Sequence, residues 1–166
     1  MKRVIIIGNT GAGKTTFARA LSEKTGISLV HLDKIFWYGD WNHLSQVEFD
    51  EALGVELEKE EWIIDGNYNR TLSRRLEYAD TVFYLDFSTI TCLWGITERI
   101  IKNHGKCRED MGGNCPDSFR KAKEMYKSTL SFNRRNRKKY RELLKKCENA
   151  IVFRSRRQIK KYLKEL

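Results

Sequence analysis

The segment Gly8-Asn9-Thr10-Gly11-Ala12-Gly13-Lys14-Thr15 restricts the fold of this chain more than any other feature. It matches the pattern G-x-x-x-x-G-K-[ST] in the context that the pattern needs. A β-branched apolar run, Val4 to Ile7, precedes it, and a helical pattern over residues 14–25 follows it. Glycines let the backbone turn so that successive N–H groups face one concavity, and the start of a helix adds a positive dipole end. We therefore expect a strand, an anion-binding nest and a helix.

The residue types in the nest predict what it holds. Lys14 is expected to extend to the β- and γ-phosphates of a nucleotide, the Thr15 hydroxyl to ligate Mg²⁺, and Thr16 to add a donor to the α-phosphate. The sequence thus predicts ATP and Mg²⁺ as cofactors. The candidate nucleotide-binding residues are Gly8, Asn9, Thr10, Gly11, Ala12, Gly13, Lys14, Thr15 and Thr16.

Length and composition suit one compact domain. The chain has 166 residues, of which 40% are hydrophobic and 33% are charged, so it can bury a core without disulfides or a structural metal. No apolar run approaches the ~20 residues of a membrane span, and the run before Gly8 is too short for a secretory signal. We expect a soluble cytoplasmic protein without a membrane segment, whose scattered cysteines are free thiols.

Short apolar runs alternate with helical patterns along the whole chain. Strands are expected at residues 4–7, 28–32, 62–64, 81–85 and 150–153, and Ser45 with Glu48 forms a capping box at the start of a helix. Such alternation predicts a parallel sheet with helices on both faces, an α/β fold of three layers. Residues 103–117 lack periodicity and are predicted to be a mobile loop, and residues 118–147 a basic helix.

Acidic residues follow three of the expected strands. Asp33, Asp65 and Asp86 stand at carboxyl ends, where ligands bind on parallel sheets, and should lie near the glycine-rich nest. For Asp86 we favour a role as a helix cap over a role in the functional site.

Positive charge is concentrated in the second part of the chain. Residues 1–94 hold 10 Lys/Arg and 14 Asp/Glu, a net charge of −4, whereas residues 95–166 hold 22 and 8, a net charge of +14. This excess can be a solvated helical face, a clamp for polyphosphate or a nucleic-acid surface, for which Arg134 to Lys139 is the best candidate. Arginines from this region that could neutralise charge during phosphoryl transfer are Arg99, Arg108, Arg134, Arg135 and Arg137.

Several segments together resemble a known family. They are Gly8–Thr16, His31–Trp37, Trp62–Tyr68, Thr97-Glu98-Arg99, and Arg108 with Asp110-Met111. The chain is similar in these segments to the adenylate-kinase-related P-loop kinases, and most of all to the DNA topology modulation (FlaR-like) proteins. The resemblance extends from the N-terminus to about residue 140.

The resemblance implies a single P-loop NTPase domain of the nucleoside-monophosphate-kinase-like type, with a five-stranded parallel sheet. Its core would comprise residues 1–33, 61–102 and 148–166, with an acceptor-binding helical insertion at 34–60 and a lid and basic helical region at 103–147. The implied metal-binding residues are Thr15 and, partly through water, Asp65. Together with the lysine of the nest and the arginines named above, the candidate catalytic residues are Lys14, Asp33, Arg99, Arg108, Arg134 and Arg137.

Two departures concern the phosphate acceptor. Residues 25–69 contain no arginine, and Asp65-Gly66-Asn67-Tyr68-Asn69-Arg70 replaces the Asp-Gly-Phe-Pro-Arg motif of adenylate kinases. We therefore do not predict adenylate kinase activity. The predicted function is a Mg²⁺-dependent phosphotransferase acting on a small molecule or nucleotide. The alternative is a nucleic-acid-binding regulator that uses ATP as a switch.

Two side-chain groups have a structural and a functional interpretation. Phe36, Trp37, Tyr38 and Trp41 could stack a ring of the acceptor, but we favour a role in packing the insertion. His104, Cys107 and Cys115 lie in the expected lid. Their spacing lacks the paired cysteines and the fourth ligand of a structural zinc site, so we do not expect zinc there.

Overall fold

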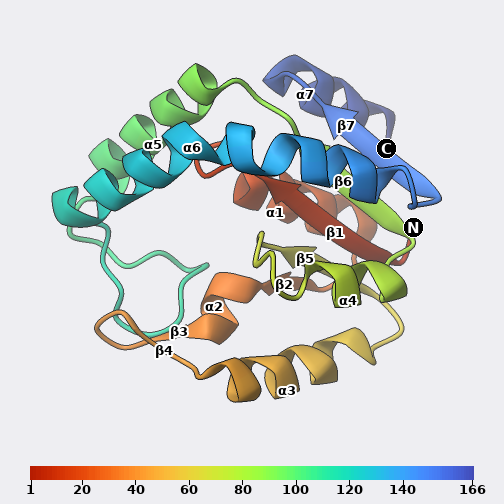
Figure 1. The fold of residues 1–166 in the computed structure, drawn as a ribbon, viewed down its shortest axis with the longest axis horizontal. Helices are drawn as coiled ribbons and strands as arrows, with labels where there is room; N and C mark the ends of the chain where they lie inside the picture. Colours follow the sequence, from red (N-terminus) through yellow and green to blue (C-terminus); the bar gives the residue numbers. More distant parts are fainter.

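A five-stranded parallel sheet forms the centre of the computed structural model, which describes residues 1–166 except for the side chain of Arg120. The strands lie in the order β2-β5-β1-β6-β7 (Figure 1). Their bounds are β1 Arg3–Gly8, β2 Leu29–His31, β5 Trp62–Asp65, β6 Thr81–Leu85 and β7 Asn149–Phe153. The predicted α/β fold with a parallel sheet is confirmed, and each expected strand is present within two residues of its expected bounds.

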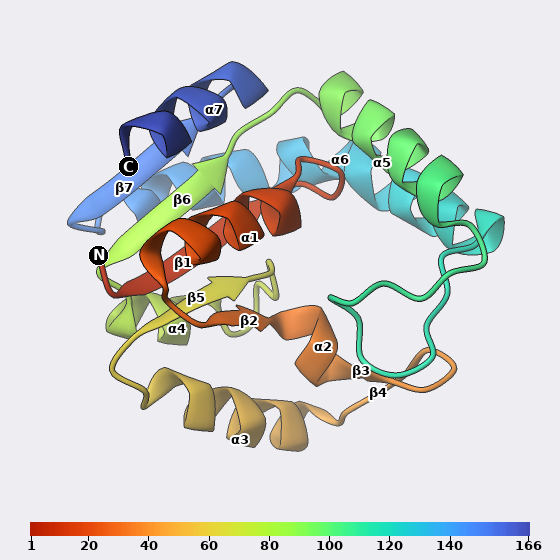
Figure 2. The same ribbon diagram turned by 180° about the vertical axis from the view of Figure 1, so that it is seen from behind.

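Helices cover both faces of the sheet, as Figures 1 and 2 show from opposite sides. One face packs against α1 (Lys14–Thr25), α5 (Thr89–Asn103) and α7 (Arg156–Glu165). The other packs against α3 (Gln46–Leu57), α4 (Leu72–Tyr78) and α6 (Phe119–Leu144).

Strand β1 is buried on both sides because it lies in the middle of the sheet. Val4 and Ile6 belong to the apolar cluster on the α1 face, whereas Ile5 and Ile7 belong to the cluster on the α3 face. Successive side chains of a strand point to opposite faces, so a continuous apolar run is what a central parallel strand needs. The burial of this run fixes the position of the nest that follows it.

The chain between β2 and β5 folds as a small cover at one end of the sheet. It contains α2 (Leu32–Phe36), a short antiparallel hairpin of β3 (Trp37–Tyr38) and β4 (Asn42–His43), and α3. The predicted capping box at the start of α3 is confirmed, since the Glu48 amide donates to Ser45 Oγ and the Ser45 amide donates to Glu48 Oε2. The hairpin was not predicted from the sequence, because each of its strands has only two residues.

The aromatic residues of this cover pack mainly against one another. The ring centroid of Phe36 lies 5.4 Å from that of Phe49 and 5.2 Å from that of Tyr68, and Trp37 lies 5.4 Å from Trp41. These contacts support the packing role that we favoured for Phe36, Trp37 and Trp41, whereas Tyr38 is exposed.

The lid loop, residues 104–118, connects α5 to α6 and crosses to the β3–β4 hairpin. A single bridge pairs His104 with Asp117, and the Asp40 amide donates to the Asn114 carbonyl over 3.0 Å. A Cβ on Gly112 would lie 1.7 Å from the Trp37 carbonyl oxygen, so this crossing requires glycine. The lid loop therefore connects the end of α5 with the β3–β4 hairpin.

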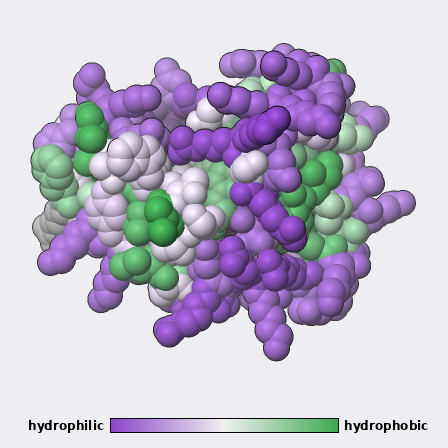
Figure 3. All heavy atoms as spheres, turned by 90° about the horizontal axis from the view of Figure 1, so that it is seen from above, coloured by the Kyte–Doolittle hydropathy of each residue, from purple (hydrophilic) through white to green (hydrophobic). Residues whose placement is uncertain are grey.

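Hydrophilic side chains predominate on the side of the molecule shown in Figure 3, with scattered hydrophobic patches between them. Within the described residues, no helix combines the length and apolar character that crossing a membrane would require.

Candidate active site

The nest between β1 and α1 is tightly packed against α5. Gly11 and Gly13 have φ angles of 79° and 90°, which glycine adopts without strain. A Cβ on Gly11 would lie 2.1 Å from the Cys92 carbonyl oxygen, and one on Gly95 would lie 2.1 Å from the Gly11 carbonyl oxygen. Backbone thus meets backbone at this contact. Gly95 is a functional residue that we did not predict from the sequence, because a glycine inside a helical pattern gives no sign of what it packs against.

Polar side chains hold the nest from the other side. The Gly8 backbone amide donates to Asn67 Oδ1 over 3.0 Å. The side-chain amide of Asn9 donates through Nδ2 to the Thr129 carbonyl on α6 over 3.2 Å. Lys14 Nζ donates to the Asn9 carbonyl over 3.1 Å. Burial lowers the pKa of Lys14, and the carboxylates of Asp65 and Asp33 oppose this effect. The nest is therefore preorganised with its lysine in place.

A hydroxyl and a carboxylate meet directly beside the nest. Thr15 Oγ1 donates to Asp65 Oδ2 over 2.7 Å, and His31 Nδ1 lies 3.3 Å from the same oxygen. The second oxygen of Asp65, Oδ1, is buried without a hydrogen-bond partner among the described residues. Hard oxygen donors suit Mg²⁺, which usually takes one or two protein ligands and completes its shell with phosphates and water. These residues fit the predicted Mg²⁺ site.

Asp33 follows β2, on α2, and faces the same space. Its Oδ1 accepts a hydrogen bond of 2.7 Å from the Tyr68 hydroxyl. Burial raises the pKa of Asp33, and the nearby Asp65 carboxylate adds to the effect, whereas the Tyr68 hydrogen bond opposes it. Burial and Asp33 also raise the pKa of Tyr68, so this hydroxyl remains a donor at neutral pH. An oriented, partly buried carboxylate of this kind can accept a proton from a substrate hydroxyl.

A buried arginine supports the loop that carries Asn67 and Tyr68. The Arg75 guanidinium is fully buried and donates to the carbonyls of Gly66 (3.0 Å), Asn67 and Tyr68 (3.3 Å). Burial lowers the pKa of Arg75 to about 10, so it remains charged at neutral pH. It is a positioning residue that we did not predict from the sequence, where it is one of several arginines on a short helix.

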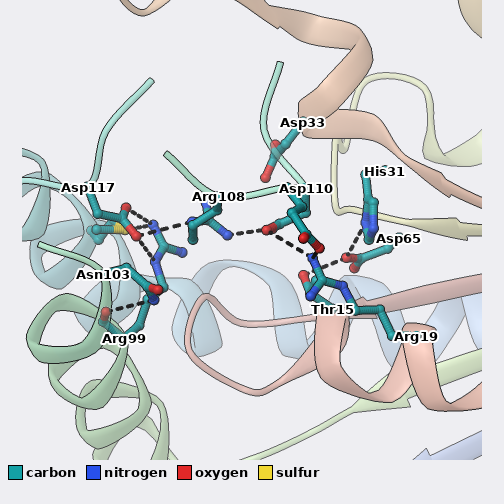
Figure 4. A network of polar contacts seen from close by, with 12 residues as sticks. Thr15, Arg19, His31, Asp33, Asp65, Arg99, Asn103, Arg108, Asp110 and Asp117 are labelled. Carbon is teal, nitrogen blue, oxygen red and sulfur yellow. Dashed lines mark hydrogen bonds and ion pairs between the residues drawn. The ribbon is translucent and has the colours of Figure 1, made fainter. Parts of the chain in front are cut away.

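Arginines of α5 and the lid loop form a chain of ion pairs over the nest (Figure 4). Arg99 Nη2 lies 2.9 Å from Asp117 Oδ1, and Arg108 Nε lies 3.1 Å from Asp117 Oδ2. Arg108 also pairs with Asp110, whose other oxygen lies 3.7 Å from Arg19 Nη2 on α1. The lid loop therefore brings both cations and carboxylates to the site.

Most of these groups line one cavity of about 740 Å³, a size that accommodates a nucleotide and a small second molecule. The structure brings together most of the predicted site residues there. Those that line the cavity are Thr10, Gly11, Gly13, Lys14, Thr15, Thr16, Asp33, Asp65, Arg99 and Arg108. The other three predicted residues of the nest, Gly8, Asn9 and Ala12, are buried and do not line the cavity.

Arg134 and Arg137 do not line this cavity. Arg134 is exposed on α6, and Arg137 Nε donates to Asp86 Oδ1 over 2.7 Å, while Arg141 pairs with the other oxygen of Asp86 over 3.1 Å. Asp86 is thus an anchor for α6, and our expectation that it caps a helix is wrong, because the Ser88 hydroxyl caps α5 instead. An arginine already paired with a buried carboxylate cannot close over a phosphate without breaking that pair.

A family model described as isopentenyl transferase matches residues 1–73, the segment that contains the nest and Asp65. Among curated proteins, no sequence matches.

Solved structures of kinases share the fold over almost the whole chain. The shikimate kinase from Bacteroides thetaiotaomicron is 16% identical, with a TM-score of 0.56, and 99% of this chain and 95% of that chain are covered. The shikimate kinase from Acinetobacter baumannii, solved in complex with shikimate, is 17% identical with a TM-score of 0.57 and coverage of 99% and 92%. A gluconokinase from Sinorhizobium meliloti 1021 is 12% identical with a TM-score of 0.54 and coverage of 99% and 88%. The chain therefore has the fold of the P-loop kinases.

Proposed function

We propose that the protein is an ATP- and Mg²⁺-dependent phosphotransferase that acts on a small molecule. One observation carries this proposal: Lys14, the Thr15–Asp65 contact and the partly buried Asp33 face a single cavity that Arg99 and Arg108 also line. A phosphate-binding nest alone would suit a switch protein as well. An oriented carboxylate beside it, with room for a second molecule, supports group transfer.

Each residue has a distinct role in the proposed reaction. The acceptor hydroxyl gives its proton to Asp33 while its oxygen forms a bond to the γ-phosphorus of ATP. The bond from that phosphorus to the β,γ-bridging oxygen breaks, and ADP leaves with the bonding electron pair. Lys14, with Arg99 and Arg108, stabilises charge on the transferred group. Thr15 and Asp65 would hold Mg²⁺, which when bound would supply charge neutralisation at the phosphates.

Two finer assignments rest on the sequence resemblance. The segments around Asp33 and Asp65 support a position among the FlaR-like members of this class. They also support the division into a core, an insertion at residues 34–60 and a lid and helical region at 103–147. In this proposal the insertion and the lid close over the acceptor and exclude water, which suppresses hydrolysis of ATP.

The alternative function, a nucleic-acid-binding regulator, has one supporting observation. Four cations lie exposed on consecutive turns of α6, away from the cavity, namely Arg134, Arg135, Lys138 and Lys139. A solvated helical face explains them equally well, and this alternative leaves Asp33 and its hydrogen bond without a role. Duplex DNA that causes no mobility shift even at low salt would exclude it.

The test compares ATP affinity and turnover in two variants. Lys14→Ala should weaken ATP binding by at least about tenfold, because it removes the cation nearest the β- and γ-phosphates. Arg108→Ala should lower turnover far more than it lowers ATP affinity, because a lid arginine acts mainly in the transition state. Calorimetric titration and ADP release in an acceptor screen measure the two quantities. Equal ATP affinity in the wild type and Lys14→Ala would refute the proposal.

A further inference from the structure

We propose that the phosphate acceptor is a hydroxyl compound without an anionic group, and this inference rests on the proposed function. The acceptor must lie where its hydroxyl can contact Asp33, on the side of the cavity formed by the chain from β2 to α4. The electrostatic character of that side therefore decides which acceptors fit.

That side of the cavity presents carboxylates and neutral groups only. Its lining residues from this part of the chain are Asp33, Asp65, Gly66, Asn67 and Tyr68. The cavity's cations come from elsewhere, since Lys14 and Arg19 belong to α1 and the others to α5, the lid loop and α7. Lys34, the residue after Asp33, is exposed and does not line the cavity.

Three arginines follow the Asp65 loop in sequence, and all three are directed elsewhere. Arg70 forms a two-pronged pair with Asp50 on α3, over 2.6 and 2.7 Å. Arg74 is exposed and donates to the Asp50 carbonyl over 3.1 Å. Arg75 is fully buried beneath the loop and contacts its carbonyls. None of them is placed to neutralise a phosphate or carboxylate on an acceptor at Asp33.

The lid loop adds a further carboxylate on the opposite side of this space. Asp110 is buried, and Figure 4 shows its side chain between Arg108 and Arg19, with Asp33 nearby. Its ion pairs with both arginines offset part of the positive charge that these two side chains bring to the cavity. An anionic acceptor would thus meet Asp33, Asp65 and Asp110 as well as the phosphates of ATP, and like charges in a confined site repel strongly.

A neutral hydroxyl compound meets no such repulsion. Oδ1 of Asp33 already accepts the Tyr68 hydroxyl, whereas no described residue donates to Oδ2. That oxygen can accept the acceptor hydroxyl. Sugars, polyols and nucleosides offer such hydroxyl groups, and their phosphates and acids do not fit the charge of the site.

The experiment uses matched pairs of acceptors that differ in one anionic group. A panel pairs nucleosides with their 5′-monophosphates, sugars with the corresponding acids, such as glucose with gluconate, and polyols with their phosphates. ADP release by the wild-type protein is measured with Mg²⁺ and ATP. We expect at least one neutral member to raise ADP release at least about tenfold more than its anionic partner does.

A charge-removing lid variant provides an independent check. Asp110→Asn frees Arg19 and Arg108 from their shared partner, so the rate with the anionic member relative to the neutral member should rise at least about threefold. Glu148→Gln is the control, because Glu148 is exposed and does not line the cavity, and it should leave this ratio unchanged.

The outcomes separate this inference from the proposed function. A preference for the anionic members, or no response to any neutral member, would overturn the inference even if ATP binding depends on Lys14. The inference would also be contradicted if Asp110→Asn and the wild type had the same ratio of the rate with the anionic member to the rate with the neutral member. ATP binding that is independent of Lys14 would instead refute the proposed function itself.

Discussion

At the scale of single residues, the site depends on groups that the sequence pattern does not reveal. The nest and the gathering of Thr15, Asp65 and Asp33 at one cavity could be predicted, because each follows a short motif or a strand. Tyr68 and Arg75 could not, since their importance comes from where the loop after β5 turns. Tyr68 has a φ of 30°, a strained value for an aromatic residue, and its hydroxyl holds Asp33.

Removing the Arg75 guanidinium should destabilise the protein. Arg75→Met keeps most of the side-chain volume but removes the buried guanidinium that donates to the carbonyls of Gly66 and Asn67, so the free energy of unfolding should fall by at least about 2 kcal/mol. Urea unfolding followed by circular dichroism measures this. The control is Arg74→Met on the same helix, an exposed position whose substitution should change stability by less than about 0.5 kcal/mol. Equal effects would show that Arg75 does not support the loop.

At the scale of elements, the order of helices and strands followed from hydrophobic periodicity and capping signals. The α1 bounds and the capping box of α3 could be predicted because local residues determine them. The contacts between elements could not. Arg137 is separated from Asp86 by 51 residues, and no local pattern indicates that this arginine anchors α6 rather than contacting a phosphate.

The contact of α5 with the nest gives a prediction at this scale. Gly95→Ala places a Cβ where only 2.1 Å separates it from the Gly11 carbonyl oxygen, so α5 must shift and the nest must distort. We expect ATP affinity to fall at least about tenfold, although alanine favours a helix by about 1 kcal/mol over glycine. Gly54→Ala on α3 is the matched control, because its Cβ meets only the flexible end of Arg74 at 3.0 Å. Calorimetric titration with ATP distinguishes the two, and an unchanged affinity for Gly95→Ala would contradict the role of this contact.

At the scale of the whole molecule, distant parts of the chain converge on one cavity. The nest comes from the N-terminal β1–α1 turn, Asp65 from β5, and the arginines from α5 and the lid loop. The lid loop in turn contacts the β3–β4 hairpin, and Lys121 Nζ lies 4.6 Å from the centroid of the Trp41 ring. The uneven charge of the chain is visible in the sequence. The pairing of Arg99 and Arg108 with Asp110 and Asp117 is not, because it depends on how the lid loop crosses the site.

The most direct measurement is the Mg²⁺ dependence of ATP affinity, because the proposed Mg²⁺ site combines Thr15 at the start of α1 with Asp65 at the end of β5. ATP is titrated calorimetrically into the wild type and Thr15→Val, each with Mg²⁺ and with EDTA. Mg²⁺ should tighten ATP binding to the wild type by at least about tenfold, and Thr15→Val should lose most of this gain while binding ATP equally well in EDTA. A wild type that binds ATP with the same affinity in Mg²⁺ and in EDTA would contradict the proposed site.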